Sequence, residues 1–196
     1  LVMGTVYHSG LQYAYNFKKN SSENPNSKMV LETADQKWNS EASAPEIQWD
    51  KSPGVIKDQT MALLGKYVSE IVPQIMPKEI EIRDEIMVGG EIPFIRIRDL
   101  ITENGIIDHK TSSKRYSSES IKSDLQSLAY LYPNGGSFHY HVAVKTKEPV
   151  IQIIDFSRSR SEVMWWEGLV KKVVKQISEG TFPENPTNWT CSERFC

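Results

Sequence analysis

Apolar and polar residues alternate over two short runs near the middle of the chain, residues 92–101 and 106–110. Both runs are rich in isoleucine, a β-branched residue that favours strands. Asn104-Gly105 lies between the two runs. This dipeptide is typical of a two-residue hairpin loop, because both positions accept positive φ angles. The pattern therefore predicts a β-hairpin at the centre of the fold.

Three ionisable side chains share one face of this predicted hairpin. Successive residues of a strand point to opposite faces, so Asp108 and Lys110 lie on the same face. A two-residue loop at Asn104-Gly105 sets Asp99 opposite Lys110, whereas a four-residue loop sets Asp99 opposite Asp108. Cross-strand partners approach to about 5 Å at Cβ, and diagonal ones to about 7–8 Å. In either register, two carboxylates and one ammonium group lie close together.

The remaining pattern predicts helices towards both ends of the chain, with strands around the hairpin. The polar residues 20–53 predict an insertion. We expect strands at 80–88, 138–146 and 150–156, and helices at 5–18 (N-cap Thr5), 54–76 (ending near Pro73) and 158–180 (apolar side Trp165, Trp166 and Leu169). One more helix is expected after an N-cap at Ser118 or Ser120, with Ile121, Leu125, Leu128 and Ala129 as its core stripe.

Composition narrows the class of protein. The chain has 196 residues and is 39% hydrophobic, which suits one domain with a substantial core. No apolar run approaches the roughly 20 residues that cross a bilayer. Two cysteines are too few for a disulfide framework and favour a reducing compartment. A net charge of −2 is unlike that of a protein that coats nucleic acid, but it allows an enzyme with a locally basic groove.

The clustered carboxylates have two interpretations. In the first, Asp99 and Asp108 bind Mg²⁺ or Mn²⁺, which prefer oxygen ligands, while Lys110 stabilises charge on a phosphate or orients a water. In the second, an exposed hairpin face carries an ordinary cross-strand ion pair. Spacing alone does not separate them. The same holds for His8, because a single histidine on a helix is more often packed or solvated than a ligand.

Four motifs in the same order along nearly the whole chain resemble those of the PD-(D/E)XK nuclease superfamily. The resemblance is to its RecB-like and CRISPR-associated-exonuclease-like branch, of phage or bacterial exonuclease type. Asp99-x8-Asp108-x-Lys110, within IIDHKTSSK, resembles the catalytic core. GTVYHSGLQ at 4–12 resembles a helix with a metal-binding histidine, DLQSLAYLY at 124–132 is similar to a Gln-x3-Tyr motif, and FPENPTNWTCSERFC resembles the tail of cysteine-bearing members.

This resemblance implies an α/β (α+β) fold with a restriction-endonuclease-like core, in which helices flank a central mixed β-sheet. It also implies one nuclease domain over residues 1–196. Within that domain, residues 20–53 would be the insertion, and residues 181–196 would be a cysteine-bearing tail, truncated if the chain is a fragment.

The resemblance also assigns roles to residues. Asp99, Asp108 and Lys110 would be catalytic, and His8, Asp99 and Asp108 would bind the metal. Gln126 and Tyr130 would face the metal pocket and the DNA backbone. Glu81 matches a glutamate of the family whose role is either in the metal shell or structural.

Further residues keep alternative interpretations. The polar and basic segment with Ser112, Lys114 and Arg115 either holds phosphates or is a solvated loop. His139 and His141 share a strand face, but the sequence shows no third ligand beside them. Cys191 and Cys196 are candidate cluster or zinc ligands. Two thiols cannot complete a four-ligand site, so an iron–sulfur cluster would require cysteines outside this chain.

The hairpin departs from the usual sequence of the family motif at Arg96 and Arg98, which replace a glycine and an apolar residue. Both arginines lie on the face opposite Asp99, so they must be paired or exposed. The packing behind the hairpin is therefore an open question at this point.

We expect a metal-dependent DNA nuclease, of exonuclease type, that acts in recombination, repair or phage DNA processing. The expected partners are DNA and a recombination or helicase protein, with no membrane, and the expected location is the bacterial or phage-infected host cytoplasm. The alternative is a non-catalytic nucleic-acid-binding or interaction module on the same fold, as part of a larger helicase–nuclease. Bound Mg²⁺ or Mn²⁺ and cleavage of linear DNA would discriminate between the two.

Overall fold

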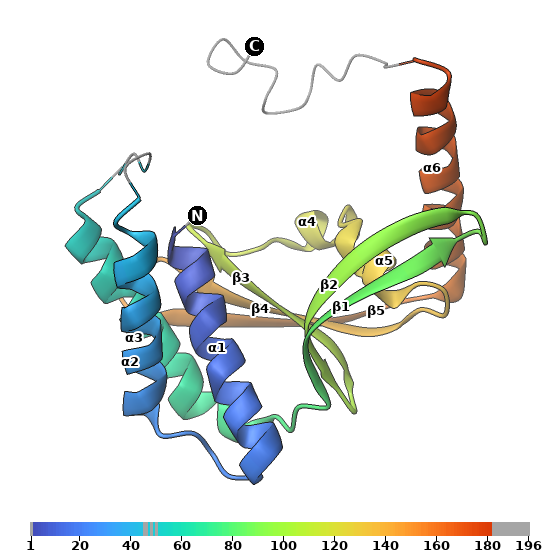
Figure 1. Cartoon of the computed structure of the whole chain (residues 1–196). Coiled ribbons are helices and arrows are strands. Elements are labelled where there is room, and N and C mark those ends of the chain that lie inside the picture. The colour runs from blue at the N-terminus through green and yellow to red at the C-terminus, as the bar shows by residue number, and fades with distance from the viewer. Residues whose placement is uncertain (1, 45–46, 48, 50, 182–196) are drawn as a thin grey trace.

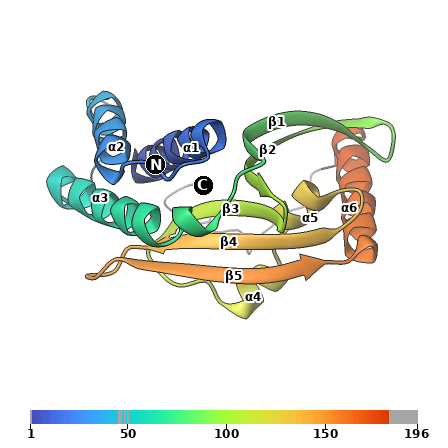
Figure 2. The same ribbon diagram turned by 90° about the horizontal axis from the view of Figure 1, so that it is seen from below.

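The computed structural model describes residues 2–44, 47, 49 and 51–181. Five strands of the described chain form one sheet in the order β1-β2-β3-β4-β5. Strands β3 and β4 are parallel, and the other neighbours are antiparallel. The strands are β1 (Glu79–Val88), β2 (Ile92–Thr102), β3 (Gly105–Ser112), β4 (Gly136–Val144) and β5 (Val150–Arg158). This mixed sheet with flanking helices confirms the predicted fold class (Figures 1 and 2).

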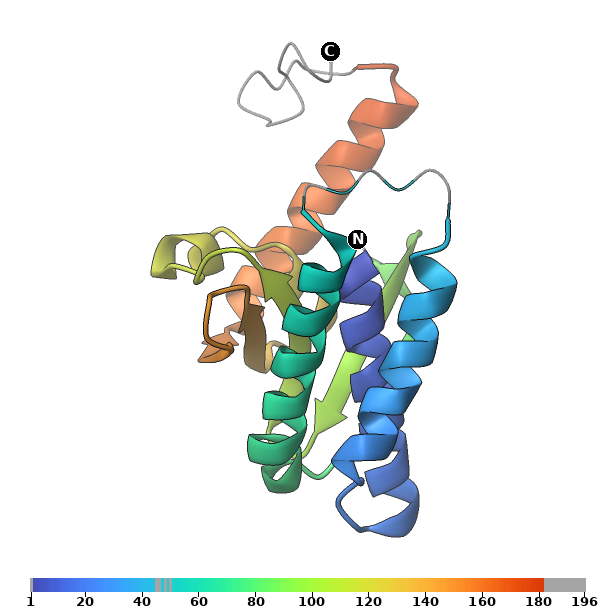
Figure 3. The same ribbon diagram turned by 90° about the vertical axis from the view of Figure 1, so that its left-hand side faces the viewer.

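Three helices, α1 (Val2–Ser21), α2 (Ser27–Glu41) and α3 (Pro53–Glu70), lie side by side and pack on one face of the sheet (Figure 3). Their core includes Leu100, Ile107 and Ala143 from three strands. A short 3₁₀ helix, η1 (Val72–Gln74), then leads to β1, close to the predicted helix end near Pro73. Helix α1 begins at Val2, so Thr5 lies inside the helix and the prediction of a Thr5 N-cap was wrong.

A second core lies on the opposite face. Ile106 belongs to it while its neighbour Ile107 belongs to the first core, as expected for residues that alternate between the faces of a strand. The helices on this side are α4 (Ser118–Lys122), α5 (Gln126–Leu131) and α6 (Arg160–Ser178). Helix α6 packs Val163 and Trp166 inward and extends beyond the β1–β2 hairpin (Figure 1).

Two helix predictions on this side need correction. The predicted single helix is broken between α4 and α5, because the Asp124 side chain accepts hydrogen bonds from the backbone N–H groups of Gln126 and Ser127 and starts a new helix. Its cap is Ser117 rather than Ser118 or Ser120, and Leu125 is exposed rather than in the core. Trp165 is also exposed, so α6 buries only one of its two tryptophans.

The predicted insertion at residues 20–53 contains helix α2, which contributes Val30, Ala34 and Trp38 to the first core. Trp38 stacks against Trp49 with ring centroids 5.6 Å apart. This part of the segment is packed structure, and its status as an insertion remains a prediction. Among the described residues, no helix has the combination of length and apolarity that crossing a membrane requires.

The central hairpin forms, but its loop is shifted by one residue. Thr102 pairs with Gly105, so Glu103-Asn104 is the two-residue loop, and the prediction of Asn104-Gly105 was wrong. The Thr102 hydroxyl stabilises this loop by accepting from Asn104 N–H and donating to the Gly105 carbonyl. Gly105 is needed in the strand itself, because a Cβ there would lie 2.4 Å from the Ser137 carbonyl oxygen of β4.

Strands β2 and β3 stay paired only from Thr102–Gly105 to Leu100–Ile107. Beyond that point β2 continues with β1 and β3 continues with β4, so the sheet splits (Figure 1). Asp99 and Asp108 are the first residues past the last β2–β3 pair, one on each side of the split. Asp99 and Asp108 take the positions expected for a four-residue loop, which sets Asp99 opposite Asp108.

Candidate active site

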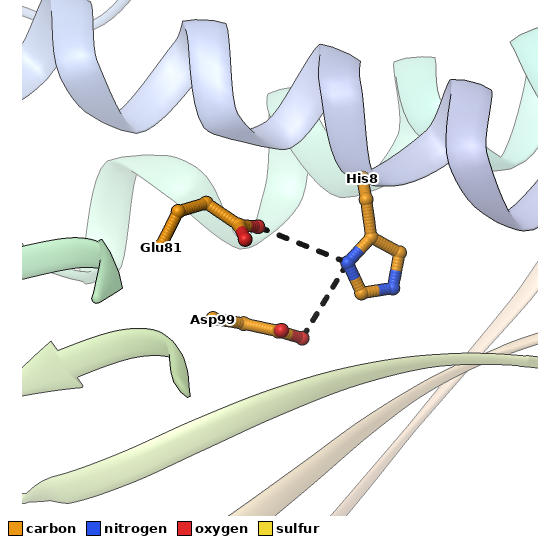
Figure 4. A group of neighbouring side chains, drawn as sticks. All are labelled: His8, Glu81 and Asp99. Carbon is orange, nitrogen blue, oxygen red and sulfur yellow. Dashed lines mark ion pairs between the residues drawn. The ribbon is translucent and has the colours of Figure 1, made fainter. Parts of the chain in front are cut away.

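Asp99, Glu81 and His8 meet at the split edge of the sheet (Figure 4). They come from β2, β1 and α1, respectively. His8 Nδ1 lies 3.6 Å from Asp99 Oδ2 and 3.9 Å from Glu81 Oε1. One ligand atom from each residue lies within 4.8 Å of those of the other two, which is close enough for a single cation to contact all three. Three segments distant in sequence therefore converge on one small site.

The orientation of His8 is fixed by its other ring nitrogen. His8 Nε2 lies 2.9 Å from the carbonyl oxygen of His109. A carbonyl can only accept a hydrogen bond, so Nε2 carries a proton and donates it. In the neutral ring, Nδ1 then presents a lone pair to the two carboxylates. Histidine ligands of metal sites are commonly oriented by this kind of second hydrogen bond.

Glu81 has an unusual backbone conformation. Its φ angle is 52°, in the left-handed region, although it lies within a strand and is not a glycine. The ladder pairs on either side, Ile80–Leu100 and Ile82–Arg98, set Glu81 directly across from Asp99. Such backbone conformations cost about 1–3 kcal/mol and cluster at functional sites. The strain at Glu81 therefore supports a role in the site beyond simple strand pairing.

Asp108 and Lys110 form the second half of the site, on β3. Lys110 Nζ lies 2.7 Å from Asp108 Oδ2. The Asp108 side chain is only 2% exposed, and its Oδ2 makes no hydrogen bond of good geometry even with the lysine beside it. A carboxylate oxygen has two lone pairs, so Oδ2 can accept another ligand beside the lysine.

Gln126 of helix α5 connects this pair to Tyr130. Its Oε1 accepts from Lys110 Nζ at 2.7 Å, while its Nε2 donates to Asp108 Oδ1 at 3.1 Å and to the Tyr130 hydroxyl at 2.8 Å. Gln126 and Tyr130, which were expected to face the metal pocket, thus lie beside Asp108 and Lys110. The amide holds both charged side chains in place, with its acceptor on the cation and its donor on the anion.

The pKa values of Asp99 and Asp108 are shifted in opposite directions. Burial, together with the nearby charge of Asp99, raises the pKa of Asp108 to about 7. Burial acts in the same direction on Asp99, but the hydrogen bonds and charge of His109, with the charge of His8, outweigh it and lower the pKa of Asp99 below its ordinary value. Asp99 is therefore the permanent anion of the pair, and Asp108 shares its charge with a proton near neutral pH.

The cationic groups respond to these carboxylates. Burial lowers the pKa of His8, but the neighbouring carboxylates of Glu81 and Asp99 more than compensate, so the pKa is raised overall. Burial likewise opposes the charge of Lys110, yet Asp108 raises its pKa above the ordinary value. Lys110 therefore remains protonated and can only donate hydrogen bonds.

A buried polar network supports Asp99 from the face of the sheet that carries α3. The backbone N–H of His109 donates to Asp99 Oδ2 at 2.7 Å, and His109 Nδ1 lies 3.6 Å from the same oxygen. His109 Nε2 is 3.0 Å from the Tyr67 hydroxyl, which also contacts His141 and Tyr15. No pattern in the sequence indicated a role for His109 or Tyr67. Tyr67 lies far away in sequence, and strand alternation placed His109 on the face opposite its neighbours Asp108 and Lys110.

Arg96 and Arg98 are paired, which answers the question left by the sequence. The Arg96 side chain is 9% exposed and forms a two-pronged ion pair with Asp84. Its remaining nitrogen donates to the carbonyl groups of Tyr130 and Tyr132 at the end of α5. Arg98 reaches the same Asp84 carboxylate at 3.2 Å. Arg96 therefore connects β2 to the helix that carries Gln126.

The other predicted site residues are placed apart from this cluster or outside the described chain. Ser112 ends β3, where its hydroxyl accepts from the backbone N–H of Lys114, and Lys114 and Arg115 are exposed. His139 pairs with Asp155, while His141 belongs to the Tyr67 network, so these two histidines have separate partners. Cys191 and Cys196 lie outside the described residues.

The residues of the site fit a divalent cation. Two carboxylates and one neutral imidazole would balance a charge of +2, and oxygen with nitrogen donors suits Mg²⁺, Mn²⁺ and similar ions. The predicted ligand set of His8, Asp99 and Asp108 is brought together in part. His8 and Asp99 gather with Glu81, whereas Asp108 contacts Lys110 and Gln126 across the split.

The sequence of the chain and its fold are similar to those of known proteins. The family model described as PD-(D/E)XK nuclease superfamily matches residues 1–196. Among solved structures, a protein from Eubacterium rectale named "Putative exonuclease" is similar in fold, with a TM-score of 0.57 and 13% sequence identity. The match covers 91% of this chain and 78% of that one. A search of curated proteins gave no match.

Proposed function

Because the chain belongs to the PD-(D/E)XK nuclease superfamily, we propose that it is a Mg²⁺- or Mn²⁺-dependent nuclease that hydrolyses phosphodiester bonds in DNA. We further propose that it acts on DNA ends, as an exonuclease of the RecB-like branch. The observation that carries this proposal is the compact group of His8, Glu81 and Asp99 at the split of the sheet, with the Asp108–Lys110 pair across the split.

Four side chains would hold the metal: His8, Glu81, Asp99 and Asp108. The first three already form a compact group, and Asp108 offers the oxygen that lacks a hydrogen bond. A bound divalent ion would supply charge neutralisation on the phosphate and a lowered pKa for water at that position. For Glu81, whose expected role from the sequence was either in the metal shell or structural, this set favours the metal shell.

Lys110 and Gln126 would act on the reacting phosphate and water. The protonated Lys110 amine donates hydrogen bonds, so it can orient the attacking water or stabilise negative charge that develops on the phosphate oxygens. Gln126 fixes the lysine through its Oε1. Tyr130, bonded to the same amide, presents a hydroxyl at the edge of the site where a DNA backbone oxygen can accept from it.

The wider role follows from the same resemblance. We propose action in DNA recombination, repair or phage DNA processing, in the bacterial or phage-infected host cytoplasm, with a recombination or helicase protein as partner. Ser112, Lys114 and Arg115 continue from the catalytic strand and would contact phosphates of the substrate.

Hydrolysis of labelled linear DNA with Mg²⁺ or Mn²⁺ tests the proposal. We expect Asp108→Ala and Lys110→Ala each to lower the rate by about a thousandfold or more, because each removes a group that acts on the transition state. Single-stranded, double-stranded and circular substrates in the same assay measure the preference for ends. Removal of metal with EDTA should stop the reaction.

Asp58→Ala is a matched control, since Asp58 is an exposed carboxylate on α3 and not part of the site. It should leave the rate unchanged. Equal activity of the wild-type protein and both site variants would contradict the proposal. Tight DNA binding by the folded wild-type protein, with no metal-dependent cleavage, would favour the non-catalytic binding module instead.

A further inference from the structure

A groove of about 440 Å³ lies between β2 and α5. Phe94, Ile95 and Ile97 line it from the strand, and Leu125 lines it from the start of the helix. Ile95, Ile97 and Leu125 are 49%, 47% and 44% exposed, which is high for large apolar side chains. Exposed apolar side chains that gather around a concavity, rather than lying scattered, are typical of a binding surface.

This groove is continuous with the catalytic cluster. Gln126 and Tyr130 line the groove, and Gln126 also contacts Asp108 and Lys110. A ligand in the groove would therefore contact the Gln126 amide, which also holds the catalytic lysine. For a nucleic-acid substrate, this position adjoins the phosphate to be cleaved.

The chemistry of the groove suits flat apolar groups and not phosphates. Its one cationic residue, Arg96, is committed to Asp84 and to the carbonyl groups of Tyr130 and Tyr132. The guanidinium group therefore has little capacity left for an anion. Two half-buried aromatic side chains, Phe94 and Tyr130, line the groove. Apolar and aromatic side chains bind nucleobases through their faces, with little dependence on sequence.

We propose that this groove binds the unpaired bases of a single strand next to the scissile phosphate, a specificity that rests on the proposed nuclease function. In a duplex, stacking covers the faces of the bases and pairing holds the bases inside the helix. An intact double helix therefore cannot fill the groove. The enzyme would therefore prefer single-stranded DNA, or duplex ends whose last bases are unpaired.

The first test measures DNA binding without metal, so that cleavage does not interfere. Ile97→Ser and Leu125→Ser replace exposed side chains outside the catalytic cluster. Fluorescence anisotropy in EDTA should show that the double variant binds a single-stranded oligonucleotide about tenfold more weakly than wild type, since stacking on apolar and aromatic side chains contributes strongly to single-strand binding. Binding of a blunt duplex should change by less than about twofold, because its bases do not reach the groove.

Ile153→Ser is a matched control. Ile153 is 45% exposed, but it lies on β5 in a separate cavity lined by His139 and His141. This variant should bind single strands as wild type does. Equal weakening of single-strand and duplex binding by the groove variants, or no weakening at all, would overturn the proposal.

The second test uses the unaltered protein. Single-stranded oligonucleotides with one abasic position, moved stepwise past the cleavage site, should be cleaved about tenfold more slowly when the missing base is the one that fills the groove. A uniform rate at every position would overturn the base-binding groove while leaving the nuclease function intact. Loss of cleavage in Asp108→Ala with single-strand binding retained would show that the catalytic and base-binding roles are separate.

Discussion

At the scale of single residues, Asp108 is the most perturbed acid of the site. It is almost fully buried and faces the charge of Asp99, and these two effects raise its pKa to about 7. Lys110 offsets part of the cost of ionising Asp108 but not all of it. The metal-free protein therefore contains a carboxylate that is ionised at neutral pH only at the expense of folding stability.

In the absence of metal, Asp108 therefore contributes stability to the fold that is greatest at low pH. Between the ordinary aspartate pKa near 4 and the raised value of about 7, the folded chain binds more protons than the unfolded chain at Asp108. The contribution of Asp108 to the free energy of unfolding should therefore fall as pH rises through this window, by at most about 1.4 kcal/mol for each pH unit. Burial lowers the pKa of His109 and of His141, so these two groups act in the opposite direction. Urea unfolding in EDTA at several pH values measures the slope.

Asp108→Asn removes the titration and keeps the size of the side chain. We expect the unfolding free energy of this variant, relative to that of wild type, to rise with pH between about 4 and 7, because the variant lacks the falling contribution of Asp108. Asp58→Asn, which changes an exposed carboxylate on α3, should keep the wild-type slope. If Asp108→Asn and wild type show the same slope, Asp108 does not have the raised pKa.

The residue scale also shows what sequence could predict. Asp99, Asp108 and Lys110 could be placed together because strand alternation and a short loop act over a few residues. The loop position was missed because Gly105 meets the carbonyl of Ser137, a contact across the sheet that no local pattern contains. The left-handed backbone of Glu81 depends in the same way on its surroundings rather than on its own residue type.

At the scale of elements, the position of α5 depends on two arginines from strands. Arg96 connects Asp84 of β1 to the last carbonyl groups of α5, and Arg158 of β5 donates to Ser127 and to the carbonyl groups of the α4–α5 break. The sequence showed Arg96 as a departure from the usual motif of the family. It could not show that the partner of Arg96 is a helix end more than thirty residues away.

Loss of the Arg96 guanidinium should therefore destabilise the protein strongly. Arg96→Met leaves the α5 carbonyl groups without their donor and Asp84 with Arg98 as its remaining cation. We expect a loss of about 3 kcal/mol, the lower end of the cost of removing one partner of a buried ion pair. Urea unfolding at neutral pH measures this loss. Arg83→Met on the adjacent strand, where the arginine is exposed, should change the unfolding free energy by no more than about 0.5 kcal/mol.

Arg96→Lys separates charge from geometry. A lysine keeps the positive charge, but its single ammonium group cannot bond the carboxylate and two carbonyl groups as the planar fork does. We expect a loss between those of wild type and Arg96→Met. Full stability in Arg96→Lys would show that charge alone accounts for the role of Arg96.

At the scale of the whole molecule, the site joins three parts of the fold. His8 belongs to the helical layer, Glu81 and Asp99 to the β1–β2 arm, and Asp108 to β3 beyond the split. Overall architecture was predictable, because helical and strand periodicities fix the order of the elements. The split was not, because it depends on where the β2–β3 ladder ends.

A divalent ion at this point would link the helical layer to both sides of the split sheet and should stabilise the molecule. An ion that binds only the folded state at 100 times its dissociation constant adds about 2.7 kcal/mol, or roughly 5–10 °C in melting temperature for a chain of this size. Thermal unfolding with Mn²⁺ and with EDTA measures the shift. Glu81→Gln and His8→Ala should each reduce it, because each removes a ligand from a different element.

Glu85→Gln on the same strand is the matched control, since Glu85 is exposed and outside the ligand group. Its metal-dependent shift should equal that of wild type. If Glu81→Gln kept the full shift while Asp99→Asn lost it, the ion would bind through β2 without β1. The strained backbone at Glu81 would then need an explanation in folding rather than in metal binding. If both variants lose the shift, the strained glutamate is part of the same metal site that joins the helical layer to the sheet.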